Sequence, residues 1–135
     1  VSEVASGGEI SRLMLSLKAL IAHAMALPSI VFDEVDTGVS GEIADKMAGI
    51  MREMAECMQV ISITHLPQVA SLGQTHYRVY KSDTETSTAT YLIKLSEKER
   101  IEEIARMLSG SSLTAAALDN ARELLKRNDL KDGKK

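Results

Sequence analysis

The sequence predicts an α/β fold in which helices flank a pair of parallel strands and an antiparallel hairpin follows further along the chain. Three observations lead to this prediction. Helical and strand-like stretches alternate through the first half of the sequence, as they do in proteins with parallel sheets. Residues 29–32 and 59–63 are rich in β-branched residues, which is typical of strands buried on both faces. Residues 76–82 and 88–95 carry Tyr, Val and Thr on either side of a polar stretch, which is typical of a hairpin.

The first element is a long amphipathic helix over residues 9–26, which Pro28 ends. Apolar residues recur in it at helical spacing and are expected to face the core; they are Ile10, Leu13, Met14, Leu17, Leu20, Ile21 and Ala24. The strand at residues 29–32 follows, and two acidic residues stop it.

A second helix follows the loop at residues 37–41, with Ser40 near its N-terminus as a candidate cap. Its expected core stripe consists of Ile43, Met47, Ile50, Met51 and Met54. The strand at residues 59–63 comes next, so the order helix, strand, helix, strand predicts one α/β layer with a right-handed crossover.

After the hairpin, two helices centred on residues 101–108 and 117–125 close the chain, and residues 127–135 are expected to be a frayed tail. All 135 residues are expected to form one soluble domain, because a chain of this length buries roughly two-thirds of its unfolded surface. The first informative motif begins within a few residues of Val1, so we expect the chain to be part of a longer protein.

Composition excludes several classes of function. A formal net charge of −3 excludes a strongly basic nucleic-acid coat. The single cysteine, Cys57, cannot form an internal disulfide and has no Cys/His ligand set, so a zinc site is not expected and a reducing cytoplasm is the expected location. No apolar run reaches the roughly 18 residues of a membrane helix, so no membrane partner is expected.

Three short motifs carry the candidate chemistry. In the first, Ser6, Gly7, Gly8 and Glu9 lead into the first helix. Glycines allow close backbone approach, the serine hydroxyl can donate, and a helix N-terminus attracts anions such as phosphate. The same residues could equally be a plain helix start with a flexible lead.

The second motif is the acid pair Asp33 and Glu34 at the end of the first strand, and the third is His65 at the end of the second. Strand ends of this kind line the crevice where ligands bind in open α/β sheets. There Asp33 could hold Mg²⁺, Glu34 could orient or deprotonate a water, and His65 could bond a γ-phosphate. Solvated acids and a structural histidine are the alternative.

Taken in order, these motifs resemble those of ABC-type ATPases: a signature motif at Ser6 to Glu9, a Walker B strand ending at Asp33 and Glu34, a D-loop acid at Asp36 and a switch histidine at His65. Residues 4–14, 32–38 and 64–70 together are similar to the RecN family of bacterial DNA repair proteins, which are SMC-like ATPases. The resemblance runs from residue 4 to about residue 110 and is most specific in its first half.

This resemblance implies the C-terminal half of an ABC-type P-loop ATPase head over residues 1–135. No Gly-x-x-x-x-Gly-Lys stretch is present, so the phosphate-gripping P-loop would come from the N-terminal half of the same head. In such proteins two heads enclose ATP and Mg²⁺. The nucleotide-binding residues of this chain would be Ser6, Gly7, Gly8, Glu9 and Asp36, with the signature residues facing the nucleotide of the second head.

On this reading Asp33 would be the metal ligand, and Glu34 and His65 would be the catalytic residues for the head's own nucleotide. The isolated chain is expected to be inactive, whereas the full-length protein would be an ATPase that acts on DNA in the cytoplasm, associated with the nucleoid. The alternative is a structural DNA clamp of the SMC or cohesin kind, in which hydrolysis only gates DNA entry. A third reading, an interaction module without catalysis, is disfavoured by the intact Asp33, Glu34 and His65.

Overall fold

The computed structural model describes residues 7–39, 41–84, 86–110 and 112–132. The chain divides into two compact units, Val1–Leu72 and Gly73–Lys135. In the described residues, no helix is long and apolar enough to cross a membrane.

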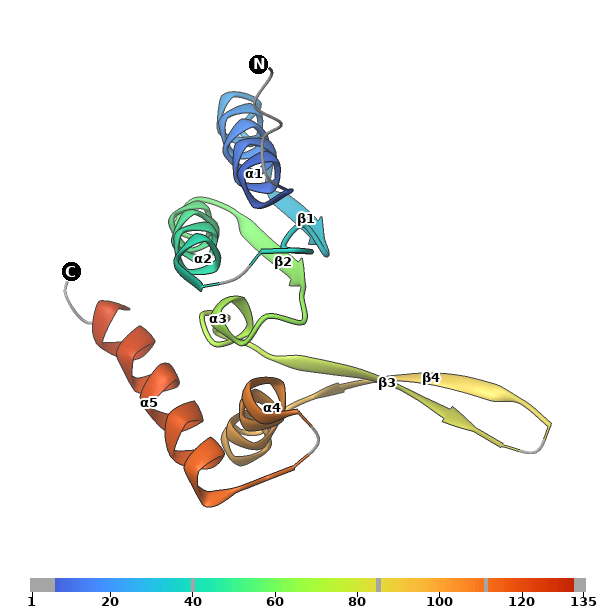
Figure 1. Cartoon of the computed structure of the whole chain (residues 1–135). Helices are drawn as coiled ribbons and strands as arrows, with labels where there is room; N and C mark the ends of the chain where they lie inside the picture. Colours follow the sequence, from blue (N-terminus) through green and yellow to red (C-terminus); the bar gives the residue numbers. More distant parts are fainter. Residues whose placement is uncertain (1–6, 40, 85, 111, 133–135) are drawn as a thin grey trace, which may run out of the picture. The chain divides into compact units, whose positions relative to one another are not determined.

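The first unit contains the predicted alternation of helices and strands (Figure 1). Its elements are α1 (Gly7–Ala24), β1 (Ser29–Asp33), α2 (Gly41–Ala55), β2 (Gln59–Ile63) and the short α3 (Pro67–Ala70), which the sequence does not predict. The two strands pair in parallel, with Ser29 opposite Gln59 and Asp33 opposite Ile63. A parallel pair needs a long crossover, and α2 supplies it.

The core of this unit lies between the helices and one face of the strand pair. Phe32 of β1 is fully buried among Leu15 of α1, Met47 and Met51 of α2, and Val69 of α3. The predicted core stripe of α2 is confirmed, with Met47, Met51 and Met54 buried and the two isoleucines partly buried. The predicted cap, Ser40, lies outside the described residues.

The predicted core face of α1 is wrong. Its large apolar side chains are exposed, and Leu15 and Ala22 are buried instead, with Ala19 packed beside them. Residues 15, 19 and 22 share a helical face, and they belong to the same core cluster as the buried residues of α2. A helix that is apolar on most of its surface has more than one candidate core face, and the described residues cover only one of them.

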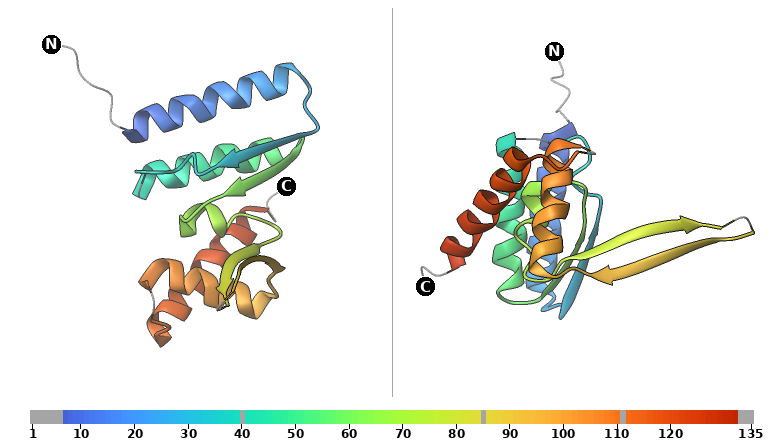
Figure 2. Two further views of the ribbon diagram at one scale, coloured as in Figure 1. Left: turned by 90° about the vertical axis from the view of Figure 1, so that its right-hand side faces the viewer. Right: turned by 90° about the horizontal axis from the view of Figure 1, so that it is seen from below.

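The expected burial of both strand faces is also wrong. Phe32 is 0% exposed, but Val31, Ile61 and Ile63 are 56%, 45% and 50% exposed. Figure 2 shows the reason: α1 and α2 lie on the same side of the strand pair. The open face therefore carries apolar side chains that nothing in the described residues covers.

The second unit begins with the predicted hairpin, which is confirmed as β3 (Tyr77–Asp83) paired antiparallel with β4 (Thr88–Lys94). Tyr80 lies opposite Tyr91, and their rings stack with centroids 5.2 Å apart. The Arg78 guanidinium lies 5.4 Å from the centre of the Tyr80 ring. The stacked tyrosines tie the two strands together, whereas the contact between Arg78 and Tyr80 lies within β3.

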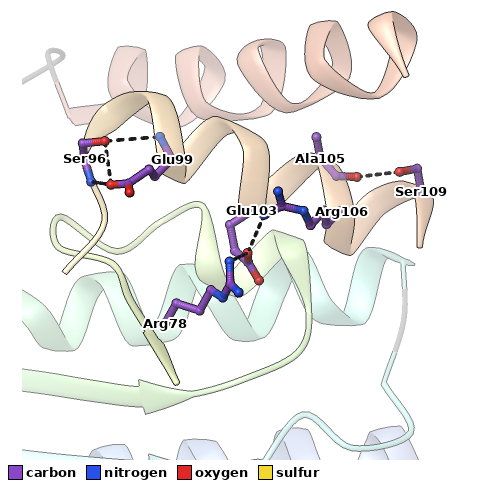
Figure 3. Close-up of polar contacts among 7 residues, drawn as sticks. All are labelled: Arg78, Ser96, Glu99, Glu103, Ala105, Arg106 and Ser109. Atoms are coloured by element: carbon purple, nitrogen blue, oxygen red, sulfur yellow. Dashed lines mark hydrogen bonds and ion pairs between the residues drawn. The ribbon is translucent and has the colours of Figure 1, made fainter. Parts of the chain in front are cut away.

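Two helices complete this unit, α4 (Glu97–Ser109) and α5 (Ala115–Asp132), which pack on each other. A capping box opens α4: the Ser96 hydroxyl accepts from the Glu99 N–H, and the Glu99 carboxylate accepts from the Ser96 N–H at 2.8 Å (Figure 3). Further along α4, the Glu103 carboxylate lies 3.6 Å from Arg78 of the hairpin (Figure 3). The expected frayed tail is helical as far as Asp132, and residues 133–135 lie outside the described residues.

Candidate active site

The parallel register brings two of the three predicted motifs to one edge of the strand pair. Asp33 ends β1 opposite Ile63, which ends β2. The next residue, Glu34, donates its N–H to the Ile63 carbonyl at 2.9 Å. Asp33 and Glu34 therefore leave the sheet beside Thr64 and His65. Both acids and the histidine have exposed side chains, so all three are accessible to a ligand at this edge.

Glu34 has a left-handed backbone conformation, with φ of +48°. Such a conformation costs a non-glycine residue about 1–3 kcal/mol, so surrounding contacts must hold it in place. Two hydrogen bonds hold the turn, because the N–H and the hydroxyl of Thr37 donate to the Glu34 carbonyl at 3.3 and 2.8 Å. The chain thus turns sharply at the first residue after β1, with the Glu34 side chain in solvent.

Asp33 fits the role of a magnesium ligand, but only together with a phosphate. Among the described residues, no group of three or more His, Cys, Asp or Glu side chains is placed to hold a metal ion. Mg²⁺ does not need such a group, since it commonly binds one or two carboxylates and completes its shell with substrate phosphates and water. The exposed carboxylate at the end of β1 meets that requirement.

Asp36 is placed differently from the other predicted site residues. Its side chain is 1% exposed, and one carboxylate oxygen, Oδ2, accepts a hydrogen bond from the Thr64 hydroxyl. The Thr64 oxygen in turn accepts from the Leu66 N–H at 3.0 Å. Thr64 is not among the predicted site residues, although a polar residue between an apolar strand and His65 could have indicated a specific contact.

The first motif falls partly outside the described residues. Ser6 is among the residues that the structure does not describe, whereas Gly7 and Gly8 are the first two residues of α1. Glu9 is exposed in the first turn. The motif therefore leads directly into the helix, as the sequence indicates, and its nucleotide contacts stay predictions.

Comparison with known proteins gives one consistent set of relatives. The chain is 46% identical over 125 residues to the DNA repair protein RecN of Rickettsia conorii, and 43% identical over 125 residues to RecN of Vibrio cholerae. RecN of Haemophilus influenzae is 42% identical over 125 residues. Each alignment covers 93% of this chain but only 22–23% of the relative. No protein-family model matches the chain.

Among solved structures, the chain matches one from work on ATP-driven dimerisation and DNA-stimulated activation of SMC ATPases. The TM-score is 0.63 at 18% identity, and the match covers 81% of this chain and 65% of the other. At this identity the likeness concerns the fold, so the chain is a mixed α/β fragment that resembles an SMC ATPase head.

Proposed function

Since the chain is a homologue of the DNA repair protein RecN and spans about 23% of that protein's length, we propose that it is the C-terminal lobe of an ATP-hydrolysing head. The parallel pairing of β1 and β2 is the observation that supports this most directly. It puts two acids and a histidine at the carboxyl ends of neighbouring strands, which is where open α/β sheets bind ligands.

Each of the three residues has a separate role in the proposed reaction. Glu34 accepts a proton from the water that attacks the γ-phosphorus, and the bond from that phosphorus to the β–γ bridging oxygen breaks. His65 donates a hydrogen bond to a γ-phosphate oxygen. Asp33 holds Mg²⁺, which when bound neutralises charge on the phosphate oxygens.

The remaining phosphate contacts are proposed to come from outside this chain. The P-loop would belong to the N-terminal half of the same head, since no such stretch occurs in the 135 residues. Ser6, Gly7, Gly8 and Glu9 would bind ATP held by a second, identical head, at the start of α1 where the helix dipole favours anions.

We assign the complete protein, working on DNA in the cytoplasm, to double-strand-break repair and recombination rather than to an SMC or cohesin clamp. The RecN relatives are 42–46% identical to this chain, whereas the SMC match rests on 18% identity. Residues 35–41, which follow the acid pair, differ from the D-loop pattern usual in SMC heads and agree with this choice.

The isolated chain should neither bind ATP tightly nor hydrolyse it, because most contacts to the β- and γ-phosphates are absent. Calorimetric titration with Mg-ATP should show no saturable binding below about 1 mM, which corresponds to about −4 kcal/mol. The full-length protein, titrated in parallel, should bind. Micromolar affinity of the isolated chain would mean that its own residues form a complete nucleotide site.

Ser6→Arg in the full-length protein tests the contact between heads. Nucleotide affinity should stay within about twofold of the parent, whereas ATP-dependent head association should be lost, because a bulky cation fills the space of the second head's phosphate. Fluorescent ATP binding and light scattering measure the two effects. Ser2→Arg introduces the same side chain just before the motif and should associate normally. Normal association of the Ser6 variant would remove Ser6 from the interface.

A further inference from the structure

The contact between Asp36 and Thr64 joins the two loops that carry the proposed catalytic residues. Asp36 belongs to the turn after β1, two residues beyond Glu34, and Thr64 directly precedes His65 after β2. The Thr64 hydroxyl donates to Asp36 Oδ2 and accepts from the Leu66 N–H. This hydroxyl therefore bonds to both loops at once.

The burial of the Asp36 carboxylate does not favour the stability of the fold. Its carboxylate is almost completely buried, and its second oxygen, Oδ1, has no hydrogen-bond partner within the described part of the chain. Burying a carboxylate is unfavourable unless hydrogen bonds compensate for lost water, and here Thr64 compensates at one oxygen. An apolar residue would fill this position at lower cost.

Backbone bonds on both sides leave little freedom between this contact and the catalytic groups. Thr37 bonds the Glu34 carbonyl, Val39 donates to the Asp36 carbonyl at 3.1 Å, and Glu34 bonds the end of β2. A shift of Thr64 relative to Asp36 must therefore change the position of Glu34 relative to His65.

We propose that Asp36 and Thr64 form a positioning pair, which sets the distance between the water-activating Glu34 and the phosphate-binding His65. This inference rests on the proposed function. It assigns Thr64 a role in catalysis without contact to the reacting atoms. It assigns the Asp36 side chain to positioning, while any nucleotide contact by Asp36 stays a separate prediction.

The test uses Thr64→Val in the full-length protein, because valine keeps the shape of threonine and removes the hydroxyl. The kcat for ATP hydrolysis should fall about 10- to 100-fold, while the KM for ATP stays within about twofold, since misplacement affects the reacting geometry rather than binding. Thr64→Ser restores the hydroxyl and should recover kcat to within about threefold of the parent. Thr90→Val makes the same change on the exposed hairpin and should have no effect.

If Thr64 served folding alone, the kcat values of its variants would follow another pattern. An unchanged kcat for Thr64→Val, or equal losses for Val and Ser, would overturn the proposal. Should the valine variant not fold, Thr64→Ser and Thr64→Cys make the same comparison, because a thiol is a much weaker donor than a hydroxyl. The serine variant should then be at least tenfold faster, and equal rates would overturn the proposal.

Glu34→Gln, measured beside these variants, separates this inference from the function it rests on. If Glu34→Gln hydrolyses ATP at the parental rate, the proposed function fails. If Glu34→Gln is inactive and Thr64→Val is fully active, only the positioning pair fails. An inactive Glu34→Gln together with a slow Thr64→Val and a fast Thr64→Ser supports both.

Discussion

Replacing Glu34 with Gln in the full-length protein is expected to lower the rate of ATP hydrolysis by about 10²- to 10⁴-fold without weakening ATP binding. The amide keeps the size of the side chain and its exposed place after β1, but it cannot take a proton from water. Asp33 and its metal contact are untouched. Heads with bound ATP should therefore stay engaged, which is measured as a lasting ATP-dependent dimer.

A matched control makes the same substitution at the other end of the strand pair. Glu56 is an exposed glutamate just before β2, far along the strand from His65. Glu56→Gln should hydrolyse ATP within about twofold of the parent. If Glu34→Gln is equally active, another group activates the water, and the arrangement at the strand ends serves binding alone.

The order and type of the main elements could be predicted from local pattern. Residues 29–32 and 59–63 have the β-branched composition of neighbouring parallel strands, and the structure pairs them in parallel. The hairpin and the two closing helices could also be predicted from local pattern. The location of the candidate site could be predicted from this order. Parallel strands that are joined by a helical crossover end at the same edge of the sheet, which brings Asp33 and Glu34 beside His65.

Contacts between elements that lie far apart in the sequence could not be predicted from local pattern. In α1 the apolar residues occupy so much of the surface that periodicity alone does not select the face that packs, and the side of Leu15 and Ala22 faces the core. The bond between Thr64 and Asp36 joins residues 28 positions apart, and no local pattern specifies such a pair. The division at Leu72 and Gly73 likewise depends on contacts rather than composition.

The two wrong predictions about burial have one feature in common. Both the large apolar side chains of α1 and the open face with Val31, Ile61 and Ile63 are exposed among the described residues. The sequence pattern is that of buried elements, and monomeric proteins rarely leave contiguous apolar patches of this kind in water. Because the chain also spans only 23% of the RecN relative, we expect other parts of the complete protein to cover both surfaces.

Neighbouring residues of β1 provide a test, because their side chains lie on opposite faces. Phe32→Ala should destabilise the isolated chain and the full-length protein alike by about 3–5 kcal/mol, since it empties a fully buried site. Val31→Thr keeps the branched shape and replaces one methyl group with a hydroxyl. In the isolated chain, where Val31 is 56% exposed, the free energy of unfolding should change by less than about 0.5 kcal/mol.

In the full-length protein the same hydroxyl should cost about 1–3 kcal/mol, because it would be buried against the rest of the head without a partner. Urea denaturation of both variants in both proteins measures the four values. The result that matters is the difference between the two proteins for Val31→Thr, with Phe32→Ala as the internal reference. A Val31→Thr cost near zero in both would show that this face stays in solvent, and the N-terminal half of the head would then have to pack elsewhere.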